Sequence, residues 1–146
     1  MRASVRKERV IGVSADRAWR VVGCPEVLHH WFPGIVECTV EGVTRTIGLA
    51  TGLQLVETML TNDDLQRRFQ YRITGPPFTE HLATIDVHAL SDDTCLVVYS
   101  SDADPATMAI ILGGGMQGAL DEIARQLEAG AGPALDAVEA LKEVPA

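Results

Sequence analysis

The hydrophobic period of the chain changes once, and this change restricts the folds that are open to it. Between Ile35 and Asp102, short runs rich in β-branched and aromatic residues recur about every ten residues. Turn-forming residues separate the runs, so this part predicts an antiparallel meander of hairpins. The turn signals are Glu41-Gly42, Thr51-Gly52, Asn62-Asp63-Asp64, Gly75-Pro76-Pro77 and Ser91-Asp92-Asp93.

After Asp104, a candidate helix cap, and Pro105, a candidate first helical residue, the period becomes helical. One apolar stripe continues for about five turns, which predicts a long amphipathic helix. The stripe consists of Met108, Ile111, Leu112, Gly115, Met116, Ala119, Leu120, Ile123 and Leu127.

The N-terminal part of the chain predicts one strand and two short helices. Residues 5–13 suit a strand, and Ser14 is a good N-cap for the first helix. Pro25 ends that helix and can begin the second one, which Pro33 and Gly34 terminate. The long helix is the only element able to cover one face of the meander. The order therefore predicts an α+β, helix-grip fold, in which a curved antiparallel sheet of about seven strands wraps around the long C-terminal helix.

A chain of 146 residues fits a single domain, and we expect its core to span residues 4–130. Residues 131–146 then form a C-terminal extension, in which 133–141 suit a short helix. A sheet bent around a helix commonly leaves space between the two, and such spaces are favoured sites for small molecules.

Composition and charge argue against several classes of partner. The formal net charge of −8 disfavours nucleic acids and anionic membrane surfaces, and no apolar run approaches the roughly 18 residues of a membrane span. Three cysteines without C-x-x-C spacing indicate reduced thiols and a cytoplasmic protein. The sequence carries no motif for a metal, a nucleotide or a redox cofactor, so we expect none. It leaves homo-oligomer formation open, because it does not identify the edge strands.

Strand alternation assigns side chains to the inner face of the sheet. The inward rows are Arg45, Ile47 and Leu49; Leu53, Leu55, Glu57 and Met59; Phe69, Tyr71 and Ile73; His81, Ala83, Ile85 and Val87; and Val97, Tyr99 and Ser101. We therefore expect an apolar cavity with a few polar groups. The candidate ligand contacts are Arg45, Glu57, Tyr71, His81, Tyr99, Trp31, Leu55, Met59, Ile85, Leu112, Gly115 and Met116.

Two of the polar candidates have both a structural and a functional interpretation. A buried Glu57 must pair with a cation or become neutral, so it forms either a salt bridge with Arg45 that only sets strand register or a polar anchor for a ligand hydroxyl or carboxylate. His81 is either a core histidine bonded to its neighbours or an acid–base group.

The run Gly113-Gly114-Gly115 is unusual inside a helix, where each glycine costs about 1 kcal/mol relative to alanine. It predicts either a kink or a widened cavity, because Gly115 lies on the apolar stripe.

Several stretches resemble the START-like (SRPBCC) superfamily, and within it the polyketide cyclase/dehydrase and lipid-transport group. The resemblance covers roughly residues 4–130 and specifies the fold better than the function. The stretches that carry it are Ser14-Ala15-Asp16-Arg17-Ala18-Trp19, Trp31-Phe32-Pro33, Gly42-Val43-Thr44-Arg45-Thr46, Val56-Glu57-Thr58, Tyr71-Arg72-Ile73-Thr74-Gly75-Pro76 and Val98-Tyr99-Ser100-Ser101.

Three functions are compatible with these observations. The first is binding or transport of a small hydrophobic ligand, such as a lipid, a polyketide or an aromatic compound. The second, which the resemblance implies, is a polyketide aromatase/cyclase that uses Glu57, His81, Tyr71 or Tyr99 as acid or base. The third is a protein-interaction module, which polar residues on the outer sheet face, such as Asp86 and Arg72, disfavour.

Overall fold

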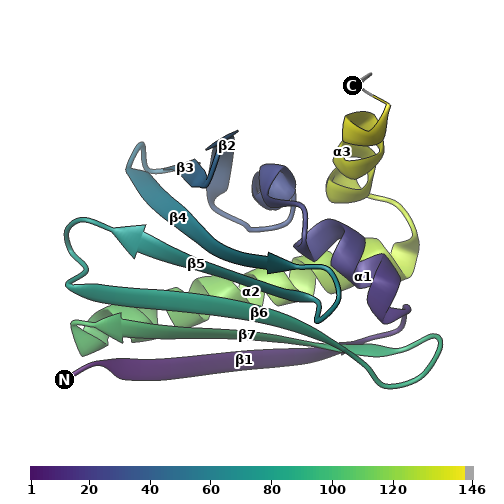
Figure 1. Ribbon diagram of the computed structural model, residues 1–146, viewed down its shortest axis with the longest axis horizontal. Coiled ribbons are helices and arrows are strands. Elements are labelled where there is room, and N and C mark those ends of the chain that lie inside the picture. The colour runs from purple at the N-terminus through teal and green to yellow at the C-terminus, as the bar shows by residue number, and fades with distance from the viewer. Residues whose placement is uncertain (144–146) are drawn as a thin grey trace.

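The computed structural model describes residues 1–143 and has the predicted α+β architecture, a curved antiparallel sheet and a long C-terminal helix (Figure 1). The sheet has seven strands in the order β1-β7-β6-β5-β4-β3-β2, so β1 and β2 are its edges. The helices are α1 (Ala15–Val22), the 3₁₀ helix η1 (Pro25–His30), α2 (Ala106–Ala129) and α3 (Pro133–Lys142). The strands are β1 (Ala3–Ile11), β2 (Ile35–Glu41), β3 (Thr44–Leu49), β4 (Gln54–Asp63), β5 (Arg68–Thr74), β6 (Glu80–Ala89) and β7 (Cys95–Asp104).

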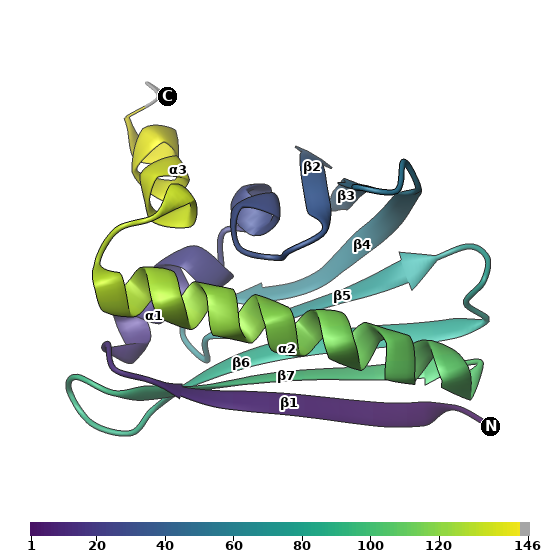
Figure 2. The same ribbon diagram turned by 180° about the vertical axis from the view of Figure 1, so that it is seen from behind.

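Helix α2 lies across one face of the sheet, as Figure 2 shows, and packs most closely on β1 and β7. The first strand pairs with the last one, from Ala3 opposite Ala103 to Ile11 opposite Cys95. This pairing brings the N-terminal strand beside the C-terminal half of the chain. Helix η1 packs on β2, and α3 packs on η1, α1 and α2. The C-terminal extension therefore forms the expected short helix as far as Lys142, while residues 144–146 lie outside the described residues.

The local capping prediction is confirmed at α1 and wrong at α2. At α1, the Ser14 hydroxyl accepts a hydrogen bond from the Arg17 N–H at 3.2 Å. At α2, Asp104 still belongs to β7, and Pro105 is the extended N-cap residue rather than the first helical one. The strand thus continues to the helix with a single residue between them.

The predicted stripe of α2 is buried from Met116 onward, whereas before Met116 its members Met108, Leu112 and Gly115 are half-buried and Ile111 is exposed. Met116, Ala119, Leu120, Ile123 and Leu127 are buried. In the first half, however, Ile111 is 65% exposed, and the buried positions are Ala109 and Gly113. The helix is thus rotated so that Ala109 and Gly113 face the sheet. The apolar pattern of the sequence did not predict this rotation, because both residues are small.

The glycine run permits close approach and does not interrupt α2, which is continuous from Ala106 to Ala129. A Cβ atom on Gly113 would lie 2.9 Å from Cγ2 of Val5 on β1, and one on Gly115 would lie 3.2 Å from the Phe32 ring. A Cβ atom on Gly114 would meet nothing within 4 Å. The run is therefore explained by the space that Gly113 leaves for Val5 and Gly115 leaves for Phe32, and not by a kink.

A buried glutamine connects three helices, and no sequence pattern predicted it. Gln126 is completely buried on α2; its amide donates to the His30 carbonyl at 2.9 Å and accepts from the Ala134 N–H at 2.9 Å. These bonds attach η1 and α3 to the end of α2.

The contrast between adjacent glycines gives a stability test. Gly114→Ala should stabilise the protein by about 0.5–1 kcal/mol, because alanine is the better helix former and its methyl group meets open space. Gly113→Ala should be less stable than Gly114→Ala by about 1–3 kcal/mol, because its methyl group overlaps Val5. Urea unfolding of both variants checks this; equal free energies of unfolding would contradict the close contact.

Candidate ligand-binding cavity

An apolar cavity of about 310 Å³ lies between the first half of α2, the segment after η1 and the inner face of β3, β4 and β5. This volume is at the small end of the range for ligand pockets. The lining residues are Leu28, Phe32, Pro33, Gly34, Ile35, Ile47, Leu49, Ala50, Thr51, Leu55, Glu57, Tyr71, Ile73, Ile111, Leu112 and Gly115.

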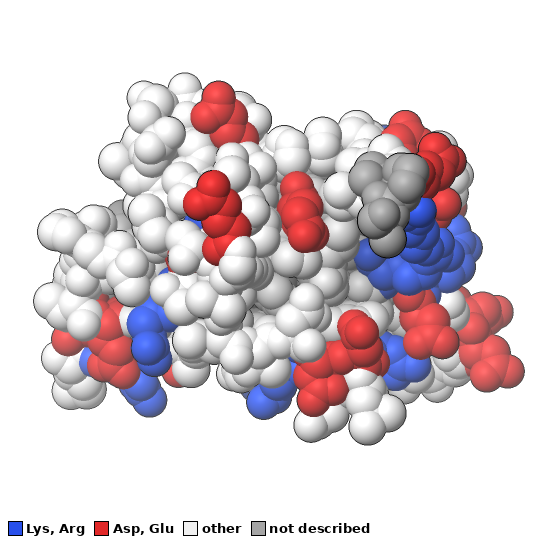
Figure 3. Space-filling model, turned by 45° about the horizontal axis from the view of Figure 1, so that its top comes forward, with Lys and Arg blue, Asp and Glu red and all other residues white. Residues whose placement is uncertain are grey.

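The cavity reaches the surface where its exposed lining residues meet. These are Pro33 and Gly34 after η1, Ala50 and Thr51 in the turn between β3 and β4, and Ile111 on α2. Figure 3 brings the upper part of Figure 1 forward and shows charged side chains gathered at the right, beside α1 and α3. The upper left of the view is largely uncharged, apart from isolated acidic groups.

A buried ion pair lies beside the cavity, and one of its members, Glu57, is a lining residue. Arg45 on β3 and Glu57 on β4 are directly opposite each other, and Nε of Arg45 donates to Oε1 of Glu57 at 2.5 Å. Both side chains are 2% exposed. Nη1 of Arg45 donates to the Pro25 carbonyl at 3.3 Å, and its guanidinium lies 5.1 Å from the ring centroids of Phe69 and Tyr71. Arg45 and Glu57 therefore form the expected cross-strand salt bridge.

Burial and the neighbouring side chains shift the pKa of both Arg45 and Glu57. Burial raises the pKa of Glu57 above its ordinary value, and the adjacent guanidinium opposes this shift. Burial also works against the charge of Arg45, but Glu57 and the tyrosine hydroxyls outweigh it, so the pKa of Arg45 is raised. Arg45 therefore remains a cation. No acceptor for its Nη2 occurs among residues 1–143.

Two tyrosines form a second polar contact inside the sheet. The hydroxyl groups of Tyr71 on β5 and Tyr99 on β7 are hydrogen-bonded to each other. Burial raises the pKa of both, so both remain protonated near neutral pH. Tyr71 lines the cavity, and Tyr99 lies behind it, where the Phe32 ring meets it edge-on at 6.3 Å between centroids.

His81 lies on the inner face of β6 and is held by two neighbours. Its Nδ1 accepts from the Ile73 N–H at 2.9 Å, so the proton is on Nε2, which lies 3.1 Å from the Ser101 hydroxyl. Burial first, and Arg72 second, lower the pKa of His81 from 6.5 to about 4. This side chain is thus a neutral, buried histidine.

The structure brings some of the candidate residues to the cavity and places others elsewhere. Glu57, Tyr71, Leu55, Leu112 and Gly115 line it. The buried or half-buried candidates that are not among its described lining residues are Arg45, His81, Tyr99, Trp31, Met59, Ile85 and Met116. The inward orientation of Leu53 is wrong, because β4 begins at Gln54 and Leu53 is 55% exposed in the preceding turn.

The segment from Phe32 to Ile35 contributes four lining residues that alternation of the later strands did not identify. It follows a 3₁₀ helix and has no regular period, so no face could be assigned to it. Its one sequence signal is Pro33-Gly34 directly after two aromatic residues. The Phe32 ring packs against Gly115, which shows why that position of α2 carries no side chain.

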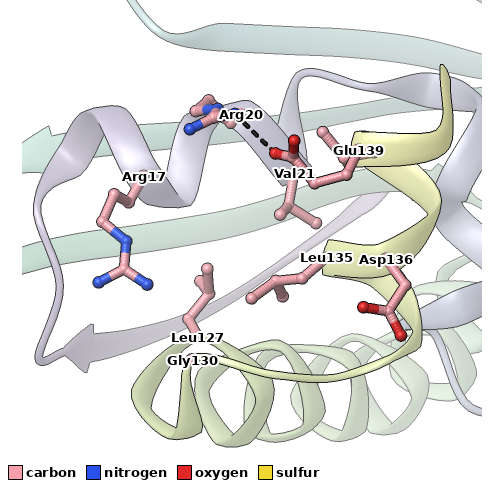
Figure 4. Close-up of a pocket in the computed structure, with 9 residues that line it drawn as sticks. Arg17, Arg20, Val21, Leu127, Gly130, Leu135, Asp136 and Glu139 are labelled. Carbon is pink, nitrogen blue, oxygen red and sulfur yellow. Dashed lines mark hydrogen bonds and ion pairs between the residues drawn. The ribbon is translucent and has the colours of Figure 1, made fainter. Parts of the chain in front are cut away.

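A second hollow, of about 270 Å³, lies between α1, the end of α2 and α3 (Figure 4). Its wall is partly charged: Arg20 and Glu139 form an ion pair at 2.8 Å across it, and both side chains are half exposed or more. Exposed pairs of this kind contribute little energy. Because the wall of this hollow is partly charged and that of the first cavity is apolar, the first cavity is the better candidate for a hydrophobic ligand.

Two further classes of site have no support in the part of the chain that the structure describes. Residues 1–143 contain no group of three or more histidine, cysteine, aspartate or glutamate side chains placed to hold a metal ion. No helix within the same range is long and apolar enough to cross a membrane.

The curved sheet, the long helix and the apolar cavity between them define a START-like protein. The chain belongs to the polyketide cyclase / dehydrase and lipid transport family, whose model matches residues 2–128. No curated protein matches it significantly.

Solved structures share the fold at low sequence identity. XoxI from Bacillus cereus superposes with a TM-score of 0.79 at 23% identity, over 84% of this chain and 94% of that one. Norcoclaurine synthase from Thalictrum flavum, solved with dopamine and hydroxybenzaldehyde, has a TM-score of 0.71 at 18% identity, over 87% of each chain. A START superfamily protein from Mycobacterium smegmatis has a TM-score of 0.66 at 17% identity, over 94% of this chain and 98% of that one.

The buried ion pair predicts a non-additive response to mutation. Arg45→Met should cost about 3–5 kcal/mol of unfolding free energy, because it leaves the Glu57 carboxylate buried without its partner. The double variant Arg45→Met/Glu57→Leu should be more stable than Arg45→Met. Urea denaturation measures the unfolding free energies of the unmodified protein and of these variants. Arg125→Met, which removes an exposed partner of Glu122, is the control and should cost less than about 1 kcal/mol. The pairing would be contradicted if the double variant lost as much unfolding free energy as Arg45→Met and Glu57→Leu lose separately when their losses are added.

His81 predicts a loss of stability in acid. Its folded-state pKa lies below the unfolded value, so its neutral form stabilises the fold fully above about pH 6.5, and this contribution is lost as the pH falls towards 4. The loss is at most about 3 kcal/mol. His81→Asn keeps an acceptor for the Ile73 N–H but does not titrate, so its unfolding free energy should fall less between pH 6.5 and 4. Parallel pH profiles of the two proteins would contradict this role.

Proposed function

We propose that this protein binds a small hydrophobic molecule in the cavity beneath α2 and carries it in the cell. The observation that carries the proposal is the cavity itself, which is lined mainly by aliphatic and aromatic side chains and reaches the surface between uncharged residues. The family description, which names lipid transport beside polyketide cyclisation, supports the same class of ligand. Lipids, polyketides and aromatic compounds of a size that fits about 310 Å³ are the candidates.

A polyketide cyclase-type enzyme is the second candidate, and one observation favours it. Glu57 places a carboxylate at the wall of an apolar cavity, where burial raises its pKa towards the range of a general base. On this proposal the bound molecule is chemically altered by the native protein and left unaltered by the Glu57→Gln variant.

We further propose a cytoplasmic location. Cys24, Cys38 and Cys95 are free thiols, and the chain shows no disulfide among its described residues, which suits a reducing compartment.

Native mass spectrometry on protein freshly purified from its own host tests the carrier proposal. We expect a co-purifying small molecule that is released on denaturation. Leu112→Trp fills the cavity and should abolish its retention. Ile110→Trp adds the same side chain two residues away on α2, at a position that is 77% exposed, and should retain it.

A native protein with no bound molecule, which also takes up none from a lipid and polyketide extract, would overturn the carrier proposal. Equal retention by Leu112→Trp and Ile110→Trp would show that the molecule binds outside this cavity.

A further inference from the structure

The polar groups at the cavity wall are few, and their arrangement specifies what a ligand must carry. Of the described side chains that line the cavity, two are both polar and buried, Glu57 at 1% exposure and Tyr71 at 6%. Thr51, the remaining polar one, lies at the exposed rim. A ligand that enters fully therefore meets a single polar end.

This polar end has no net charge. Glu57 lines the cavity, and one of its carboxylate oxygens already accepts from Arg45. Arg45 lies behind Glu57, bonded to the Pro25 carbonyl and stacked near Phe69 and Tyr71, and no basic side chain occurs among the described lining residues. The charges of the pair cancel, so the wall offers no uncompensated charge to a buried ion.

The tyrosine pair determines which hydroxyl is available. Tyr99 is completely buried, and the hydroxyl groups of Tyr71 and Tyr99 are hydrogen-bonded to each other, with either oxygen able to act as the donor. A phenol can donate one hydrogen bond and accept others, so in both directions of this bond Tyr71 keeps a further hydrogen-bonding position.

Strand register places the Tyr71 and Glu57 side chains next to each other. Glu57 is opposite Ile73, and Met59 is opposite Tyr71, so Glu57 and Tyr71 are diagonal neighbours on the inner face of β4 and β5. Diagonal neighbours on one face are about 7–8 Å apart at the backbone, within reach of long and aromatic side chains. One small group can therefore contact both.

We infer that the ligand is an uncharged molecule with a hydroxyl group, an alcohol or a phenol, which donates to Glu57 and forms a second hydrogen bond with the Tyr71 hydroxyl. This inference rests on the proposed ligand-binding function and narrows it. A carboxylate would meet the Glu57 oxygen without a cation of its own, and an ammonium would be buried against a carboxylate that Arg45 already neutralises. Burying an ion without a compensating charge is costly, whereas a hydroxyl satisfies both wall groups.

Four compounds with one skeleton test the inference: 2-naphthol, 2-naphthoate, 2-naphthylmethylammonium and 2-methylnaphthalene. At pH 7 the first is neutral, because phenols ionise near pH 10 (about the value for tyrosine), and the next two are charged. We expect 2-naphthol to bind at least about tenfold more tightly than each of the others, as one charge-assisted hydrogen bond allows. Isothermal titration calorimetry on the full chain measures the four dissociation constants.

Two variants assign the preference to the wall groups. Tyr71→Phe keeps the ring and removes the hydroxyl, so it should weaken the binding of 2-naphthol severalfold and leave the binding of 2-methylnaphthalene unchanged. Glu57→Gln keeps the shape and leaves Arg45 without its anion, so it should weaken 2-naphthol and strengthen 2-naphthoate. Circular dichroism confirms that each variant is folded, and Tyr71→Phe alone decides the matter if Glu57→Gln does not fold.

The outcomes separate this inference from the function on which it rests. If all four compounds bind equally, or if an ion binds as tightly as 2-naphthol, the cavity binds hydrophobic molecules and the hydroxyl inference is wrong. An unchanged affinity for 2-naphthol in Tyr71→Phe also overturns it. If none of the four binds, the ligand-binding function itself is contradicted, and the inference with it.

Discussion

The ion pair between Arg45 and Glu57 is the constraint on which the inner face of the sheet depends. Two charges are removed from water between adjacent strands, and the arrangement is tolerable only while each remains beside the other. A slip of one residue between β3 and β4 would turn every side chain of one strand to the opposite face. The pair therefore fixes the register of these strands, and the same register gives Glu57 its place at the cavity wall.

The apolar cavity lies beneath the first half of α2, on the side of the molecule that carries the ion pair. Around the second half of α2, Met116, Leu120, Ile123 and Leu127 fill the space beneath the helix, and Gln126 attaches η1 and α3 there. The first half of α2 faces β3, β4 and β5 through Leu112 and Gly115, and the neighbouring wall carries the small residues Gly34 and Ala50. Larger side chains at these positions would occupy the cavity next to Glu57 and Tyr71.

The order of elements and the inner rows of β3, β5, β6 and β7 were predictable, because strand period and turn residues are local signals. The opposition of Arg45 and Glu57 followed from the same alternation on neighbouring strands. Alternation could not separate residues that pack in the core, such as Tyr99 and Ile85, from those that border a cavity, such as Tyr71, because all of them are buried. The rotation of α2 and the contribution of Phe32 were missed for a related reason. Both depend on glycines that make a contact without a side chain, and a hydrophobic pattern does not record such contacts.

The chemistry of the ion pair favours a carrier over a catalyst. A general base must take up a proton during turnover, and a protonated Glu57 would leave Arg45 as a buried cation without its partner. Burial raises the proton affinity of Glu57, but each proton that it accepted would cost the attraction within the pair, which is strong in a site with little water. Hydrogen bonding to a ligand hydroxyl requires no such change, since the carboxylate keeps its charge and Arg45 keeps its partner. Within this ion pair, Glu57 is thus better suited to accept a hydrogen bond from a ligand than to accept a proton during turnover.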